Sequence, residues 1–173
     1  MIIRLLDIEN GRVIPTEHCY TIAVLKDIMD NNPEERYLKI YAYLFYMTCP
    51  DPEKNPFFHM PEDEKEETIL REVRADFSPE EDGIIKALKF CEKAYDTPTK
   101  RAYIGIKIAM DNIANYMATT KITHGRDGSI QGIRQMAKDF QDIRDSFKGA
   151  FSDLMDEQKS QLKGGGDSAY DQR

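Results

Sequence analysis

The stretch from Thr97 to Ser160 constrains the fold of this chain more than any other. Its apolar residues recur in steps of three and four, which is the spacing of an amphipathic helix rather than a strand. A glycine-containing segment at 125–129 interrupts the pattern once. The apolar positions are Tyr103, Ile106, Met110, Ile113 and Met117, then Ile130, Ile133, Met136, Ala137, Phe140, Ile143, Phe147, Phe151 and Leu154. We therefore predict a hairpin of two long helices, each roughly 30–45 Å in length.

Thr97 and Pro98 mark the start of this hairpin. Threonine is a favoured N-cap residue, and proline is tolerated in the first helical turn because its missing N–H would be unpaired there. In a two-helix hairpin, each helix buries only one of its faces against the other helix. The remaining apolar surface must therefore pack on other helices of the chain or on copies of it.

The N-terminus carries the signature of a β-hairpin. Asn10-Gly11 lies between two short apolar runs at 2–8 and 12–14, and Asn-Gly is the strongest short-range signal for a two-residue hairpin turn. We predict a small hairpin over about 2–14. Because an isolated two-stranded hairpin is marginal in water, it must lie on a helix or pair with a neighbouring subunit.

Between the two predicted hairpins, four more helices are expected, at about 20–30, 33–48, 61–73 and 78–95. The second is apolar almost all round, which predicts a central position or one between subunits. Ser78 and Glu81 have the spacing of a capping box for the last of them. The predicted fold is mainly α, with five to six helices in one domain over 1–160. A flexible polar, glycine-rich tail follows at 161–173.

Composition excludes several classes of protein. The net charge of −7 argues against a general binder of the nucleic-acid backbone, which needs clustered Lys and Arg. No apolar run approaches the roughly 20 residues that cross a bilayer, so we expect no membrane partner, and we see no signal peptide. Cys19, Cys49 and Cys91 form no CxxC pair and are expected to be buried small hydrophobic residues.

The acidic residues are the best candidates for chemistry. All-helical nucleotide pyrophosphohydrolases hold magnesium with a Glu-Glu pair and an ExxD pair, and Glu66-Glu67 or Glu80-Glu81 could supply the first. Glu92 and Asp96 are spaced four apart instead of three. Acids at a helix start also simply suit the helix dipole. His18, His59 and His124 lack a second ligand at metal spacing, and the sequence has neither a nucleophile elbow nor a phosphate-binding glycine loop. We therefore predict no catalytic, cofactor-binding or metal-binding residue.

Basic residues gather at the tip of the long hairpin, where Lys121, His124 and Arg126 fall close together in sequence. Such a tip is either a solvated loop or a surface that faces a channel. In a ring of copies, each of these charges would be multiplied by the number of subunits.

Three segments together resemble small virion structural proteins of large tailed phages, especially the crAss-like phages of gut Bacteroidales. They are Asp7 to Glu17, the segment from Tyr37 through Asn55-Pro56-Phe57 to Lys65, and the long C-terminal hairpin. The resemblance implies a ring or adaptor subunit of the neck or tail, stacked below the portal in rotational, commonly twelvefold symmetry. It implies copies of itself, the portal and other neck or tail proteins as partners, with DNA in the channel nearby.

The leading hypothesis is therefore a non-enzymatic head–tail connector subunit, made in the host cytoplasm and located in the virion. The alternatives are a small all-α nucleotide pyrophosphohydrolase and a phage-encoded regulator that binds a host protein through the tyrosine-rich helix. The expected interaction residues are Ile3, Leu5, Val13, Tyr37, Tyr41, Tyr46, Lys121, His124 and Arg126. Deleting residues 1–15 is predicted to leave a folded helical core that no longer joins the particle.

Overall fold

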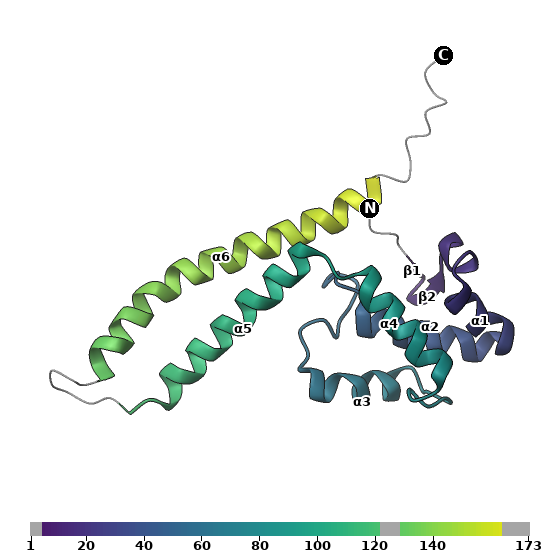
Figure 1. The fold of residues 1–173 in the computed structure, drawn as a ribbon, viewed down its shortest axis with the longest axis horizontal. Helices are drawn as coiled ribbons and strands as arrows, with labels where there is room; N and C mark the ends of the chain where they lie inside the picture. Colours follow the sequence, from purple (N-terminus) through teal and green to yellow (C-terminus); the bar gives the residue numbers. More distant parts are fainter. Residues whose placement is uncertain (1–4, 122–128, 164–173) are drawn as a thin grey trace, which may run out of the picture. The chain divides into compact units, whose positions relative to one another are not determined.

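The computed structural model describes residues 5–121 and 129–163 and divides the chain into two compact units (Figure 1). Unit 1 is Met1–Asp96 and unit 2 is Thr97–Arg173. The fold class is confirmed as mainly α with a small N-terminal β-hairpin and a long C-terminal helix. That 1–160 form a single domain stays a prediction, and the two compact units are described in turn. The large hydrophobic core lies entirely in unit 1, and unit 2 has its own seam between two helices.

The predicted β-hairpin is present, with β1 at Leu6–Glu9 and β2 at Arg12–Pro15. The strands pair antiparallel, and Glu9 lies opposite Arg12 beside the turn. Asn10 and Gly11 both have positive φ, at 50° and 75°. A type I′ turn requires this at both central residues, which explains why Asn-Gly occupies the turn.

The hairpin is built into the core of unit 1. Leu5 and Leu6 are each 1% exposed and Val13 is 5% exposed. The N–H of Leu5 donates to the hydroxyl of Tyr95 at 3.4 Å, and its carbonyl accepts from Sγ of Cys19 at 2.8 Å. The two strands therefore rest on the helices, as the instability of an isolated hairpin requires.

Four α-helices and one 3₁₀ helix complete unit 1. Their bounds are Glu17–Tyr20 for the 3₁₀ helix η1, Ala23–Asn31 for α1, Glu34–Thr48 for α2, Glu62–Glu72 for α3 and Asp82–Ala94 for α4. Helix α2 contacts α1, α3, α4 and β2, which is the central one of the two positions predicted for it. Its buried residues include Tyr41, Tyr43, Leu44 and Phe45.

Two helix starts differ from the sequence-based prediction. The first helix was expected from about residue 20, but η1 precedes it and α1 begins at Ala23. Helix α4 begins at Asp82 with Glu81 at the N-cap, not after Ser78. The N–H of Ser78 donates to Oε1 of Glu81 at 2.9 Å, but the N–H of Glu80 donates to Oγ of Ser78 at 3.2 Å. Residues 78–81 therefore form a turn before the helix.

Unit 2 is the predicted helical hairpin, with α5 at Pro98–Thr119 and α6 at Ser129–Lys163. Oγ1 of Thr97 accepts from the N–H of Lys100 at 3.1 Å, which confirms the predicted cap. At about 1.5 Å per residue, α5 is about 33 Å long and α6 about 52 Å. Helix α6 extends through the first three residues of the predicted tail, and 164–173 lie outside the described residues.

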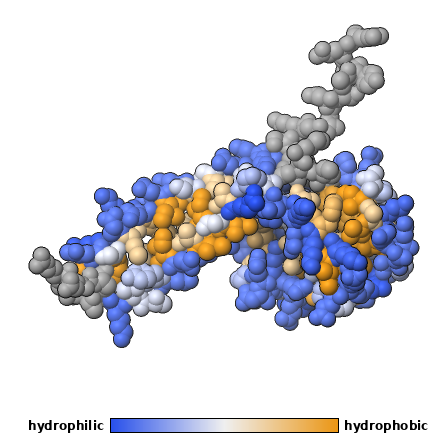
Figure 2. Space-filling model, viewed as in Figure 1, coloured by the Kyte–Doolittle hydropathy of each residue, from blue (hydrophilic) through white to orange (hydrophobic). Residues whose placement is uncertain are grey.

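The two helices meet along the apolar stripes that the sequence predicts. Tyr103 is 1% exposed, and its ring lies 5.1 Å from that of Phe147 and 5.8 Å from that of Phe151, centroid to centroid. Half-buried stripe residues are Ile106, Met110, Ile113 and Met117 on α5, and Ile130, Ile133, Met136, Phe140, Ile143, Phe147 and Phe151 on α6. Figure 2 shows hydrophobic residues in orange along the hairpin. No helix in the described ranges is long and apolar enough to cross a bilayer.

Candidate interaction surfaces

The hairpin residues expected to contact a partner are in the core instead. Leu5 and Val13 are buried, so their side chains are unavailable to a neighbouring subunit. A two-stranded hairpin this short is stable only when one of its faces packs on another element, here α2. The side chains of Leu5 and Val13 lie on the packed face. Ile3 lies outside the described residues.

The three tyrosines of α2 that were expected to contact a partner divide into two groups. Tyr41 is fully buried, and its hydroxyl donates to the carbonyl of Leu25 at 2.8 Å. Burial raises the pKa of Tyr41, so this phenol stays neutral. Tyr37 and Tyr46 are half-buried, and only these two of the three remain candidates for contact with a partner.

A groove of about 840 Å³ runs beside β2, and we call it the hairpin groove. Its walls come from the turn and β2 on one side and from α2 on the other, with Tyr20 and the end of α3 at its margins. The lining residues are Gly11, Arg12, Val13, Ile14, Pro15, Tyr20, Glu34, Glu35, Tyr37, Leu38, Lys39, Ala42, Tyr46, Glu72 and Val73. The groove thus brings Tyr37 and Tyr46 together with the backbone of β2.

The hairpin groove has aromatic and apolar walls with charges at its rim. The ring of Tyr46 packs edge-on against Phe57 with centroids 5.2 Å apart, which fixes its position. Burial raises the pKa of both Tyr37 and Tyr46. Lys39 is paired with Asp76 at 3.1 Å and with Glu35 at 3.3 Å, and its hydrogen bond to Asp76 raises its pKa. The groove suits an extended peptide more than a small charged ligand.

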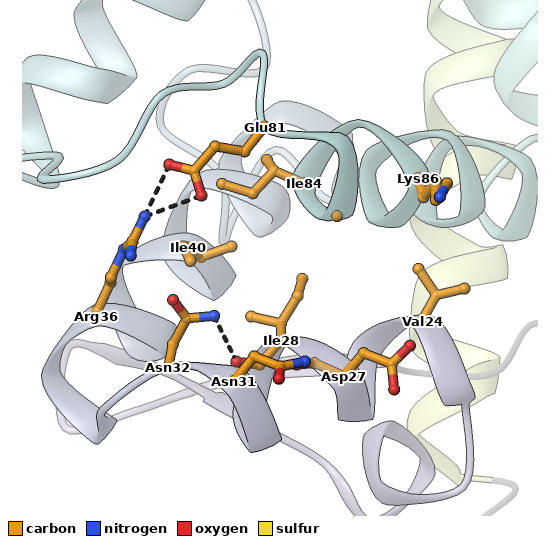
Figure 3. Close-up of a pocket in the computed structure, with 11 residues that line it drawn as sticks. Val24, Asp27, Ile28, Asn31, Asn32, Arg36, Ile40, Glu81, Ile84 and Lys86 are labelled. Atoms are coloured by element: carbon orange, nitrogen blue, oxygen red, sulfur yellow. Dashed lines mark hydrogen bonds and ion pairs between the residues drawn. The ribbon is translucent and has the colours of Figure 1, made fainter.

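A second pocket, of about 450 Å³, lies between α1, α2 and the start of α4 (Figure 3). One guanidinium nitrogen of Arg36 donates to both carboxylate oxygens of Glu81, at 2.7 and 2.9 Å. Figure 3 shows this pair beside Ile28, Ile40 and Ile84. The pair joins α2 to the start of α4, while Nε of Arg36 is buried without a hydrogen-bond partner among the described residues.

The acidic candidates do not converge on a metal site. Glu66 accepts a hydrogen bond from the hydroxyl of Tyr43 at 2.7 Å, and Glu81 is paired with Arg36. In the part of the chain that the structure describes, no three His, Cys, Asp or Glu side chains form a group that could hold a metal ion. Glu66 and Glu81 therefore have structural partners, and the structure does not bring Glu66-Glu67 together with Glu92 and Asp96 as a cluster.

The basic tip falls mostly outside the described residues. Lys121 is exposed at the end of the described part of the tip, whereas His124 and Arg126 lie in the segment 122–128. The other two histidines contribute no ligand pair. His18 is exposed, and the ring of His59 packs against Phe58 with centroids 5.0 Å apart.

All three cysteines are free and buried, as expected from the sequence. Burial raises the pKa of Cys19 to about 11 and that of Cys91 to about 12. Thiolate, not thiol, reacts with Ellman's reagent. At about pH 8, we expect the native protein to react slowly and the protein unfolded in guanidinium to release all three equivalents at once. Fast stoichiometric reaction of the native protein would contradict this burial.

Sequence reasoning missed the residue that organises the loop after α2. Asn55 is 1% exposed and uses both ends of its amide on nearby backbone. In the sequence it is one polar residue in a proline-rich segment that reads simply as a loop. An Asn between prolines after a helix is a weak signal for such a role, because most loop asparagines are exposed.

No protein-family model matches this chain, and neither a curated protein nor a solved structure matches it.

Proposed function

We propose that this chain is a non-enzymatic structural subunit of a tailed-phage virion, a ring or adaptor protein between the portal and the tail. The resemblance of residues 7–17, of 37–65 and of the long hairpin to such proteins is one support. The other support is the hairpin groove, in which an unpaired strand edge lies beside aromatic side chains. A strand edge and a groove of this kind suit a protein that functions by binding other subunits.

In the sheet that the structure describes, no third strand pairs with β2, and this unpaired edge is the observation that carries the proposal. In a hairpin with a two-residue turn, the residues flanking the turn exchange hydrogen bonds, here Glu9 and Arg12. The next pair is Ile8 and Val13, whose backbone groups therefore point away from the partner strand. On β2 the outward N–H and carbonyl belong to Val13, which is 5% exposed and lines the hairpin groove.

An extended segment of the neighbouring subunit would add to this edge as a further strand. Strand addition gives affinity through backbone hydrogen bonds and specificity through side-chain pockets. Here Tyr37, Leu38 and Tyr46 would supply the pockets. Because the donor segment and the groove are different surfaces, the contact is heterologous, and its repetition closes a ring when the rotation per subunit divides a full turn.

Tyr20→Glu tests the groove without touching the core, since Tyr20 is 55% exposed at the margin of the groove. We expect the variant to fold with an unchanged circular dichroism spectrum and thermal midpoint, and to be incorporated poorly into particles. The readout is its abundance in purified particles from an infection complemented with the variant gene. Lys89→Glu is the control. Lys89 is exposed on α4, and this substitution changes the net charge more than Tyr20→Glu does, yet the variant should be incorporated normally.

The identity of the assembly is tested by quantitative peptide mapping of purified virions, beside native mass spectrometry of the recombinant protein. We expect about twelve copies per virion, even if the isolated protein assembles no ring without its template. Absence from virions would overturn the proposal. The next assay would then be nucleotide hydrolysis by the wild-type protein in the presence of magnesium. If the chain is an enzyme, the double variant Glu66→Ala, Glu67→Ala should abolish that turnover.

A further inference from the structure

The turn of the N-terminal hairpin holds the one Asn-Gly pair of the sequence. Asn10 and Gly11 are both exposed, between β1 and β2. An asparagine followed by glycine is especially reactive, because glycine has no side chain to hinder attack by its own backbone nitrogen on the asparagine amide. The two residues that form the turn are therefore also a place where the chain can change covalently.

The reaction is a cyclisation followed by hydrolysis. The backbone nitrogen of Gly11 forms a bond to Cγ of Asn10, the bond from Cγ to Nδ2 breaks, and ammonia leaves with the proton of the Gly11 N–H. Water then opens the five-membered succinimide ring at either of its carbonyl groups. One opening gives aspartate, and the other gives isoaspartate, in which the main chain runs through Cβ and Cγ. Water is the one reactant added to the chain.

The closed turn holds the reacting atoms apart. The φ angles of Asn10 and Gly11, 50° and 75°, are those of a type I′ turn, whose first central residue has a ψ angle of about 30°. Ring closure needs the Gly11 nitrogen on the same side of the Cα–C bond as Cβ of Asn10. With ψ near this value, the nitrogen lies almost on the opposite side. The peptide between the two residues must therefore rotate, and the turn must be lost, before the ring can form.

Loss of the turn disturbs the core of unit 1. The turn sets the register in which β1 and β2 pair, and this register places Leu6 and Val13 in the core at 1% and 5% exposure. Beyond β1, the carbonyl of Leu5 accepts from the N–H of Thr16 at 3.1 Å and from Sγ of Cys19 at 2.8 Å. Opening the hairpin breaks these contacts, so the open state costs free energy and is sparsely populated.

We propose that Asn10-Gly11 is a modification site that the closed hairpin protects and that hydrolyses through a succinimide whenever the hairpin opens. The rate of conversion then follows the population of the open hairpin. This inference goes beyond the proposed function. It concerns the chemistry of unit 1, and it holds or fails in the purified protein whether or not the chain is found in virions.

The two products have different consequences for the fold. Aspartate keeps the length of the main chain and tolerates positive φ, so the turn can form again. Isoaspartate lengthens the main chain at the turn, and the register of a two-residue hairpin depends on the length of its loop. The strands then cannot return Leu6 and Val13 to the core in the same register. Isoaspartate therefore makes the opening of the hairpin permanent.

Peptide mapping of the full-length protein by mass spectrometry, after incubation at mildly alkaline pH, measures the conversion. Deamidation of Asn10 raises the mass of its peptide, whereas isomerisation at Asp82-Gly83 leaves the mass unchanged. We expect the chain unfolded in guanidinium to convert at least about tenfold faster than the native protein, because its turn is absent. Equal rates would overturn the protection, and an unfolded chain that does not convert would overturn the site itself.

Leu6→Ala tests whether opening of the hairpin controls the rate. This variant loses buried contacts of β1, so we expect conversion in buffer to rise at least about tenfold over the wild-type rate. Lys89→Ala, exposed on α4, is the matched control and should convert at the wild-type rate. The wild-type protein in guanidinium below its unfolding transition gives the same test without a substitution, and its rate should rise with the concentration. Rates that respond to neither change would refute control by opening.

The effect of isoaspartate is measured on the converted protein after chromatographic separation. We expect Asn10→Asp to unfold in urea near the wild-type midpoint, since it reproduces the aspartate product. The isoaspartate form should have a clearly lower midpoint or no cooperative transition of unit 1, followed by circular dichroism. An isoaspartate form as stable as Asn10→Asp would show that the hairpin closes again, and the permanent opening would be wrong.

Discussion

Deletion of residues 1–15 is expected to unfold unit 1, and not to leave the folded helical core that the sequence alone suggests. The deletion removes Leu5, Leu6 and Val13, all buried among the helices. Losing one buried leucine side chain typically costs about 2–5 kcal/mol, and a whole domain is stable by only about 5–15 kcal/mol. We expect loss of the cooperative urea transition of unit 1, followed by circular dichroism.

Two single substitutions on β1 show whether stability depends on the buried side chains of the hairpin or on any change in it. Leu6→Ala should lower the free energy of unfolding by about 2–5 kcal/mol, because Leu6 is 1% exposed. Glu9→Ala lies on the same strand but is exposed, and should change it by less than about 0.5 kcal/mol. If both variants unfolded at the wild-type urea concentration, the hairpin would be an appendage and not part of the core.

The deletion is consequently a poor test of assembly. A variant without residues 1–15 would fail to join particles because unit 1 is unfolded, whatever surface the neighbour contacts. Tyr20→Glu changes the margin of the hairpin groove and leaves the buried side chains in place. The two variants together distinguish a role of the hairpin in stability from a role of its groove in binding.

Most apolar positions of the helical hairpin could be predicted, although Ala137, expected in the stripe, is exposed and α6 is longer than the roughly 30–45 Å expected. Its stripe repeats over many turns, so each apolar position reinforces the same period. Thr97-Pro98 and Asn10-Gly11 were equally informative, since each satisfies a local backbone requirement that few other residues meet. Where the signal is local or repeated, sequence and structure agree.

Orientation within α2 could not be predicted in the same way. A helix that is apolar almost all round gives no preferred inward direction, so Tyr41 looked as available as Tyr37 or Tyr46. The carbonyl of Leu25, on another helix, accepts the hydroxyl of Tyr41 and holds it inside. Which side chains of such a helix are buried is decided by contacts with segments that are distant in the sequence.

The start of α4 depends on a similar long-range contact. Arg36 pairs with Glu81 across 45 residues, and no local pattern reports that. The capping-box spacing of Ser78 and Glu81 was therefore a correct sign of a turn, but it placed the helix start too early.

Asn55 is the clearest case of a role that emerges only from the fold. Its Nδ2 donates to the carbonyls of Tyr46 and Cys49, each at 2.9 Å. Its Oδ1 accepts from the N–H of Phe57 at 3.1 Å. One buried amide thus joins the end of α2 to both sides of a loop that contains three prolines and few backbone donors of its own.

Asn55→Asp is expected to destabilise unit 1 by at least about 3 kcal/mol at neutral pH, measured by urea unfolding. The variant keeps the acceptor for Phe57 but sets a carboxylate oxygen against two carbonyl oxygens in a buried site. Asn112→Asp, on the exposed side of α5, should change the stability of unit 1 little.

Comparison with Asn55→Ala identifies the cause. Alanine leaves the carbonyls of Tyr46 and Cys49 without their donor, at a cost of about 1–3 kcal/mol for each buried group, but introduces no repulsion. Aspartate has nearly the size of asparagine and adds that repulsion. If Asn55 merely filled space, Asp would be the milder change. If its amide donors organise the loop, Asp is the more damaging of the two, and its penalty shrinks at low pH as the carboxyl group gains a proton to donate.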